Sequence, residues 1–354
     1  MIGDGLAKIM VLGVGGGGGN AVSRMWRAGL DGVQLVAVNT DAQVLSIMEA
    51  DQHLQLGRKL TGGLGAGGDP EVGREAAEES REEIKDLLEG FDMVFVTAGM
   101  GGGTGTGGAA VVAEVSKALG ILTVAIVTRP FSFEGAARAD KARSGIEKLS
   151  QHVDALITIS NDKLLKVAPP DMPLSGAFEM VDAVLLQGVQ GITELITVPG
   201  LINLDFADVE SVLRGAGTAM MGIGDAEGEN KSREAARRAI SSTLLDAPVK
   251  NARKAILNIA AGEGLTLEEV TEAAQVVQEA LSDKADLIFG ATIREGMEKA
   301  RITVIATGFA VQSGDELPES DEAALLERIE REGTVRDDYD VPTYLRRSRR
   351  SESS

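Results

Sequence analysis

Two glycine-rich segments are the parts of this chain whose residue types are best suited to chemistry. GVGGGGGN (residues 13–20) and GMGGGTGTGG (residues 99–108) each follow an apolar run and each open a helical pattern. Because glycine has no side chain, the backbone N–H groups of such a loop can approach a ligand closely. A loop that leads from a strand into a helix points those N–H groups at an anion, usually a phosphate. Two such loops predict a nucleotide with several phosphates, held from two sides.

The first segment leaves two other interpretations open. Gly13, Gly15 and Gly18 satisfy the pattern G-x-G-x-x-G, and Asp41 stands about twenty residues further on, as in NAD-dependent oxidoreductases. A tight strand-to-helix turn without a ligand is the simpler interpretation of a lone motif. The second segment favours a polyphosphate, because a dinucleotide fold needs only one such loop. Neither segment ends in GK[ST], so backbone amides, helix dipoles and a bound cation would have to meet the phosphate charge.

A pair of acids forms the next candidate. Asp205 and Asp208 stand three residues apart at the start of a later helical pattern, and Asn203 precedes them. Side chains at this spacing share one face of a helix. Taken alone, the pair is typical of acids that cap a helix N-terminus and complement its dipole.

The elements that must position the glycine segments alternate between strands and helices over the first 160 residues. Apolar runs predict strands at residues 8–12, 34–38, 93–97, 122–127 and 155–159. Helical patterns lie between them at residues 21–28, 70–89, 109–119 and 136–150. This alternation is typical of a parallel sheet covered by helices. Ligands of such sheets bind at the carboxyl ends of the strands, where both glycine segments would lie.

A long helix is predicted next, over residues 174–196, because apolar residues recur there every three or four positions. It would span roughly 35 Å, and Pro199-Gly200 would end it. A second region follows, with strands predicted at residues 218–223, 255–259, 285–289 and 302–307 and helices at 231–242 and 267–282. Strands with fewer crossover helices indicate a smaller mixed sheet.

Composition narrows the function classes. The net charge of −19 argues against a general nucleic-acid-binding protein, because such proteins carry an excess of lysine and arginine. The chain has no cysteine, which excludes disulfides and thiolate metal sites and fits a reducing cytosol. His53 and His152 lie far apart, so no histidine metal site is expected. No apolar run reaches about 18 residues and no signal-peptide pattern opens the chain, so we expect no transmembrane insertion.

The second segment also carries a resemblance. GGGTGTG (residues 101–107) is the signature of the tubulin family, and other motifs follow the same family in order. They are VGGGGGNAV (14–22), AVNTDAQ (37–43), LGAGG (64–68), RPFSFEG (129–135), NDKLL (161–165) and PGLINLDFAD (199–208). The chain therefore resembles the tubulin/FtsZ family, and within it the bacterial cell-division proteins, from residue 7 to about 312 and again in the tail peptide.

The resemblance implies a fold and a domain division. The fold would be tubulin-like α/β: a parallel-sheet GTP-binding domain joined by a long central helix to a smaller α+β domain with a mixed sheet. The implied parts are a Rossmann-like GTP-binding domain (1–173), a central helix and catalytic-loop connector (174–203), a C-terminal GTPase-activating domain (204–313), an acidic disordered linker (314–336) and an adaptor-binding peptide (337–354).

The resemblance also implies a GTP/GDP site, with Mg²⁺ on the phosphates. The residues that it assigns are Gly16, Gly17 and Asn20 at the α- and β-phosphates, Ala66, Gly67 and Gly68 over the γ-phosphate, Gly103, Thr104, Gly105 and Thr106 around the phosphates from the other side, Glu134 at the ribose, Arg138 near the phosphates, and Asn161, Phe178 and Asp182 at the base. An ionised carboxylate at Asp182 accepts from the N1–H and 2-amino group of guanine, donors that adenine lacks there. Ala183, Asp69 and Gly62 depart from the commoner family residues.

The acidic pair takes a catalytic role in this resemblance. Asp205 and Asp208, with Asn203, would orient the water that attacks the γ-phosphate. The acids follow the long helix and the phosphate loops precede it, so one molecule would not bring them together. A second copy stacked head to tail would complete the site, and such a contact propagates into a filament. A GTP-binding scaffold that does not hydrolyse remains an alternative that the acidic pair disfavours.

The tail and the location follow from the same resemblance. Residues 337–350 resemble the family's peptide for membrane-anchoring division adaptors such as the actin-like FtsA. The expected partners are thus further copies of this chain and such adaptors, with no nucleic acid. The expected location is cytoplasmic, at the mid-cell division site under the inner membrane.

Overall fold

The computed structural model describes residues 7–169, 171–198, 200–245, 249–282 and 284–309. They belong to one compact unit, Met1–Phe309. Pro199, the acidic linker and the adaptor-binding peptide lie outside the described residues.

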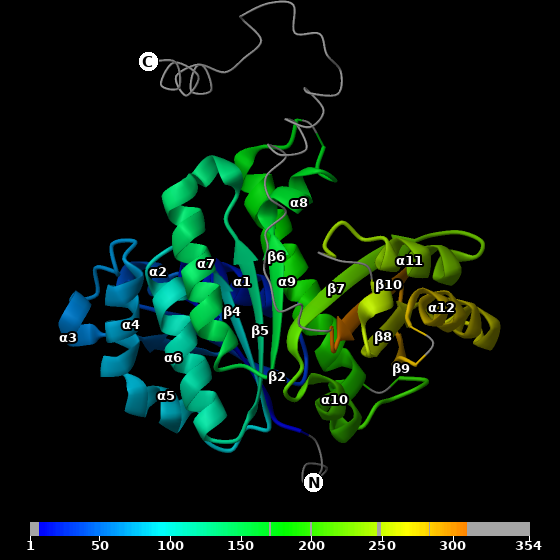
Figure 1. The fold of residues 1–354 in the computed structure, drawn as a ribbon, viewed down its shortest axis with the longest axis horizontal. Helices are drawn as coiled ribbons and strands as arrows, with labels where there is room; N and C mark the ends of the chain where they lie inside the picture. Colours follow the sequence, from blue (N-terminus) through cyan, green and yellow to red (C-terminus); the bar gives the residue numbers. More distant parts are fainter. Residues whose placement is uncertain (1–6, 170, 199, 246–248, 283, 310–354) are drawn as a thin grey trace, which may run out of the picture. The chain divides into compact units, whose positions relative to one another are not determined.

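A large parallel sheet forms the first half of this unit (Figure 1). Its strands lie in the order β3-β2-β1-β4-β5-β6, and every neighbouring pair is parallel. Their bounds are β1 Ile9–Val14, β2 Val33–Asn39, β3 Gln52–Gln55, β4 Met93–Gly99, β5 Leu122–Arg129 and β6 Ala155–Ser160. This arrangement confirms the predicted parallel sheet.

A smaller mixed sheet continues from β6. β7 (Gly217–Ala226) pairs with β6 over a short stretch, from Ala155 with Gly217 to Ile157 with Ala219. Beyond it, β10 (Ala300–Thr307) runs antiparallel to both β7 and β8 (Lys254–Ala261), and β9 (Asp286–Ile293) runs parallel to β8. The predicted mixed sheet is confirmed, and it is joined edge to edge to the parallel one.

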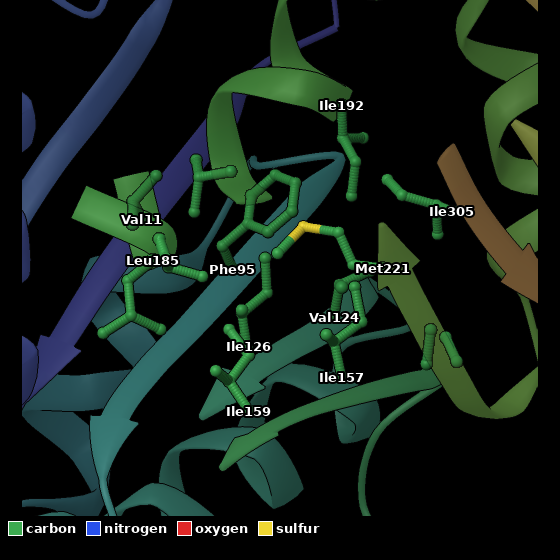
Figure 2. Packing of buried hydrophobic residues seen from close by; sticks show 14 of the residues in the cluster. Val11, Phe95, Val124, Ile126, Ile157, Ile159, Leu185, Ile192, Met221 and Ile305 are labelled. Atoms are coloured by element: carbon green, nitrogen blue, oxygen red, sulfur yellow. The ribbon is translucent and has the colours of Figure 1, made fainter. Parts of the chain in front are cut away.

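Helices cover both faces of the parallel sheet, and alternate side chains of each strand serve the two faces. On one face, Val11 and Phe95 belong to a cluster that includes residues of α1 (Gly15–Arg27), α9 (Leu174–Thr197) and α10 (Phe206–Leu213). Figure 2 shows this cluster, in which Phe95, Leu185 and Met221 lie among the strand residues. The other face is covered by α4 (Pro70–Glu79), α5 (Arg81–Leu88), α6 (Thr104–Ala118) and α7 (Ala136–Ser150).

The C-terminal sheet has a third cluster of its own. Its apolar strand residues, such as Leu257 and Val304, pack against α11 (Lys231–Ile240) and α12 (Leu267–Ala280). Gly222 of β7 lets α11 lie close to the sheet, because a Cβ added there would lie 2.1 Å from the Ala239 carbonyl oxygen. Of the helices in the described part of the chain, none is both long and apolar enough to cross a bilayer.

The long helix α9 runs along one face of the parallel sheet, from the carboxyl ends of the strands to their amino ends. Near its start, Phe178 makes an edge-on contact with Phe131, just past the carboxyl end of β5, with ring centroids 5.5 Å apart. At its end, the Thr197 hydroxyl donates to the carbonyl of Asp31 (3.4 Å), which precedes the start of β2. A helix of 24 residues is about 36 Å long. The segments before and after α9 therefore lie at opposite ends of the sheet.

Candidate functional site

Three glycine loops meet at the carboxyl ends of the parallel strands. A Cβ added at Gly15, in the first loop, would lie 2.8 Å from the backbone nitrogen of Gly105 in the second. A Cβ added at Gly103, in the second loop, would lie 2.8 Å from the Cβ of Ala66 in the third. Only glycine at these positions lets the three backbones come so close. The structure thus brings together the phosphate-binding segments that the sequence predicts.

The first loop is itself the start of a helix. α1 begins at Gly15, and its N-cap residue Val14 provides no side-chain hydrogen bond. Gly16, Gly17 and Asn20 are exposed, while the neighbouring Gly15 is buried. The first-turn N–H groups, which have no partner within a helix, are the groups that bind anions. Glycines 15–19 were expected as loop, and the structure makes them helix.

The second loop leads into α6, whose N-cap is Gly103, again without a side-chain cap. Thr104 and Thr106 are buried, and their hydroxyls have partners within the protein. The Thr104 hydroxyl bonds to that of Thr40 (2.6 Å), and the Thr106 hydroxyl accepts from the N–H of Gly101 (2.8 Å). The loop therefore offers chiefly backbone N–H groups to a phosphate, together with the positive end of the α6 dipole.

The third loop is a glycine turn between Leu64, which bridges Asp41, and Asp69, which caps α4. Gly67 and Gly68 have φ of +59° and +75° and are exposed, whereas Ala66 is buried. Asp69, one of the departures from the family pattern, caps α4 by accepting from the N–H of Glu71 (2.9 Å). Gly62, another departure, has a φ of +58° at the end of α3 (Arg58–Thr61), a backbone conformation that suits glycine.

The acid of the dinucleotide pattern has a different task. Asp41 is the N-cap of α2 (Ala42–Ser46), where its carboxylate accepts from the N–H groups of Gln43 (2.9 Å) and Val44 (3.0 Å). It also forms an isolated bridge with Leu64 at the start of the third loop. These contacts explain an acid at this position without a ribose.

The predicted ribose and phosphate contacts lie beside the second loop. Glu134 accepts from the N–H of Phe131 (2.8 Å) and pairs with Arg138 (3.1 Å). A Cβ added at Gly101 would lie 2.7 Å from Cγ of Arg138, so the guanidinium-bearing chain runs along this loop. The Arg138 side chain is 51% exposed, which leaves it accessible to a ligand.

The predicted base contacts come from α8 (Asn161–Leu165) and α9, which pack against each other. Asn161 is buried and its Oδ1 has no hydrogen-bond partner. Phe178 is 41% exposed, so part of its side chain is accessible. Burial raises the pKa of Asp182 to about 6; the charge of Arg24 opposes this rise and that of Glu179 adds to it. A buried acceptor without a partner and a partly accessible aromatic side chain fit a planar base with donor groups.

The acidic pair lies at the opposite end of the sheet. Asp205 is the N-cap residue of α10, yet its side chain makes no capping hydrogen bond, unlike those of Asp41 and Asp69. Asp205, Asp208 and Asn203 are all exposed. The Asn203 Oδ1 accepts from the N–H of Gly200 (2.6 Å), which shapes the turn after α9. Capping therefore does not account for the Asp205 carboxylate, whereas Asp208 stands in the first turn of α10, where an acid complements the helix dipole.

The fold and the three loops define a nucleotide-binding α/β protein, with phosphate loops at one end of its parallel sheet and exposed acids at the other. Residues 8–169 match the Tubulin/FtsZ family GTPase domain, and residues 217–310 match the C-terminal domain of the FtsZ family. The chain belongs to the tubulin/FtsZ family. It therefore carries the family's GTPase domain, which binds GTP and GDP.

Solved structures agree with this assignment. The empty FtsZ dimer of M. jannaschii is 49% identical, with a TM-score of 0.83 over 85% of this chain and 88% of that one. CetZ1 of Haloferax volcanii, a GDP-bound monomer, is 22% identical with a TM-score of 0.75 over 91% of this chain and 99% of that one. CetZ2 of the same organism, a GTPγS-bound protofilament, is 23% identical with a TM-score of 0.73 over 92% and 100%. At these identities the two CetZ proteins show the shared fold.

Proposed function

We propose that this chain is a GTP-dependent polymerising protein of bacterial cytokinesis, which stacks head to tail into protofilaments and forms the division ring. GTP is hydrolysed at the joint between subunits. The observation that carries the proposal is that the phosphate loops lie at the carboxyl ends of the parallel strands, whereas the exposed acids lie at the other end of the sheet. The helix that runs between the two ends, α9, is about 36 Å long.

Nucleotide binding rests on the three loops and the base side. Gly16, Gly17 and Asn20 serve the α- and β-phosphates, Ala66 to Gly68 serve the γ-phosphate, and Gly103 to Thr106 wrap the phosphates from the other side. Glu134 and Arg138 hold the ribose and phosphates. Asn161 Oδ1 and the Asp182 carboxylate accept from guanine, and adenine would leave both unpaired in a partly buried site.

Hydrolysis is completed by the neighbour. Asp205 and Asp208 of one subunit, with Asn203, orient and polarise the water that attacks the γ-phosphate of the next subunit's GTP. Positioning and charge stabilisation are most of what phosphoryl transfer needs. Among the described residues no group of three or more His, Asp or Glu is placed to hold a metal, so Mg²⁺ would be held chiefly by the phosphate oxygens. When bound there, it neutralises negative charge.

The geometry supports self-association. A contact between the two different ends is heterologous, and a heterologous contact that does not close into a ring of subunits extends into a filament. The FtsZ dimer of M. jannaschii and the CetZ2 protofilament described above support assembly in this family. We further propose the domain division given above, with residues 337–350 binding a membrane adaptor of the FtsA kind at the mid-cell membrane.

Light scattering of the full chain with GTP, GDP or ATP, over a range of protein concentrations, tests this function. We expect scattering to rise, which reports assembly, with GTP alone. Phosphate release measured in the same samples should give a GTPase rate per molecule that rises with protein concentration. Assembly without turnover would indicate a non-hydrolysing scaffold, and tight binding of NAD with no GTP binding would indicate an oxidoreductase. A rate per molecule that is independent of concentration would contradict hydrolysis at the joint.

A further inference from the structure

The third glycine loop is held from outside by a lysine of α7. Lys141 donates from Nζ to the carbonyl oxygen of Gly68 (2.7 Å). One turn earlier on the same helix, Arg138 lies against Gly101 of the second loop, and a Cβ there would lie 2.8 Å from the Arg138 carbonyl oxygen. One face of α7 thus touches both loops that surround the predicted phosphate end.

Besides the Lys141 contact, one backbone hydrogen bond fixes this segment of the third loop: the N–H of Asp69 donates to the carbonyl oxygen of Ala66 (3.0 Å) and closes a turn around Gly67 and Gly68. The loop is anchored at its ends, where Leu64 bridges Asp41 and Asp69 caps α4. Between them, Gly67 and Gly68 both have positive φ, and a Cβ added at either would meet nothing within 4 Å. Glycines in open space lose much conformational entropy when a ligand orders them.

We propose that Lys141 is a positioning residue for the terminal phosphate of GTP. The peptide between Gly68 and Asp69 already donates its N–H to Ala66, and the Lys141 ammonium holds its carbonyl as well, so that the loop is ordered before the nucleotide arrives. The ammonium also places a positive charge beside the phosphate loops in a chain that has no GK[ST] lysine. This inference rests on the proposed function, in which the third loop closes over the γ-phosphate.

The inference predicts different effects on the affinities for GTP and for GDP. The third loop has a phosphate to contact only in the triphosphate, so a looser loop costs affinity for GTP and leaves affinity for GDP unchanged. A general weakening of the fold would reduce both alike. Lys148 provides a matched control, because it is an exposed lysine two turns further along α7 whose charge acts on Glu71 rather than on the loop.

The test is calorimetric titration of the full chain with GTPγS and with GDP, at equal Mg²⁺ and below the concentration at which the protein assembles. Lys141→Met should weaken GTPγS binding about 3- to 10-fold, the net contribution of one ordinary hydrogen bond, because the ammonium is exposed to water. GDP binding should stay within about twofold, Lys141→Arg should recover most of the loss, and Lys148→Met should match the wild type.

Three results would overturn the inference: wild-type affinities in Lys141→Met, an equal loss for both nucleotides, or the same selective loss in Lys148→Met. Each of these leaves the proposed function intact, because the wild type still binds. A wild-type chain that binds neither nucleotide would instead refute the proposed function and this inference together.

Discussion

The pH dependence of guanine binding is the prediction that the structure specifies most closely. Only the ionised Asp182 carboxylate accepts two hydrogen bonds from guanine, and burial raises its pKa to about 6 in the free protein. Bound guanine favours the ionised form, so the contribution of Asp182 is complete well above pH 6 and is lost as the pH falls through it. The ionised fraction of Asp182 drops about tenfold between pH 7 and pH 5, and affinity for GDP should drop with it.

The assay must separate Asp182 from the phosphates, which also titrate. We would measure GDP affinity by calorimetry from pH 5 to pH 8 for the wild type and for Asp182→Asn, and take the ratio. The variant should bind about 10- to 100-fold more weakly at pH 7, because it loses hydrogen bonds to a charged group. The two affinities should then converge as the pH falls.

A second variant checks the cause of the shift. Glu179 adds to the raised pKa of Asp182 by charge repulsion, so Glu179→Gln should move the midpoint of the pH dependence below that of the wild type. A ratio that stays constant with pH would refute the assignment of Asp182 to the base. A midpoint near 4, the ordinary value of aspartate, would refute the role of burial.

Three further predictions follow from the same structure. Asp205→Ala and Asp208→Ala should each bind GTP and assemble while losing turnover, as measured by phosphate release and sedimentation; loss of assembly would argue for a structural role. Gly107→Ala should destabilise the protein by about 1–3 kcal/mol in denaturant unfolding, because its Cβ would lie 1.9 Å from the Pro70 carbonyl oxygen, whereas Gly102→Ala, in open space, serves as the control. Truncation after Val335 should leave GTPase activity intact and abolish recruitment to adaptor-coated vesicles; unchanged recruitment would exclude an adaptor role for the tail.

Most of the elements can be predicted from the sequence, because both sheets are made of buried apolar strands. The helix over residues 136–150 coincides with α7, whose amphipathic pattern is regular. β3 escapes prediction because Gln52–Gln55 is a short, polar edge strand. The helix predicted over residues 70–89 is two helices, α4 and α5, that meet at Ser80. The Ser80 hydroxyl accepts from the N–H of Gly57 (3.0 Å), a contact that no local pattern reveals.

The candidate site, too, can be predicted from the sequence only in part. Glycine loops can be recognised from composition, and their meeting at one end follows from the parallel sheet. Which side chains hold the loops does not follow, because the residues are remote in sequence: Lys141 and Gly68 are 73 positions apart, and Thr40 and Thr104 are 64 apart. The first helix begins at Gly15, whereas the pattern predicts a start at residue 21. The predicted start is too late because glycine is a poor helix former, so a run of glycines does not look helical in sequence. In the proposed function this helix N-terminus binds the phosphates.

Hydrolysis in trans is the central claim, and mixing two inactive variants tests it most directly. Asp208→Ala keeps the phosphate loops but lacks one of the acids. Gly105→Val keeps the acids but displaces the second phosphate loop, since a Cβ there would lie 2.9 Å from the Gly99 carbonyl oxygen. Each variant alone should release no phosphate from GTP, and the mixture should regain activity, because the acids of one act on the GTP of the other. A mixture as inactive as its components, although the two co-sediment, would contradict hydrolysis across the joint.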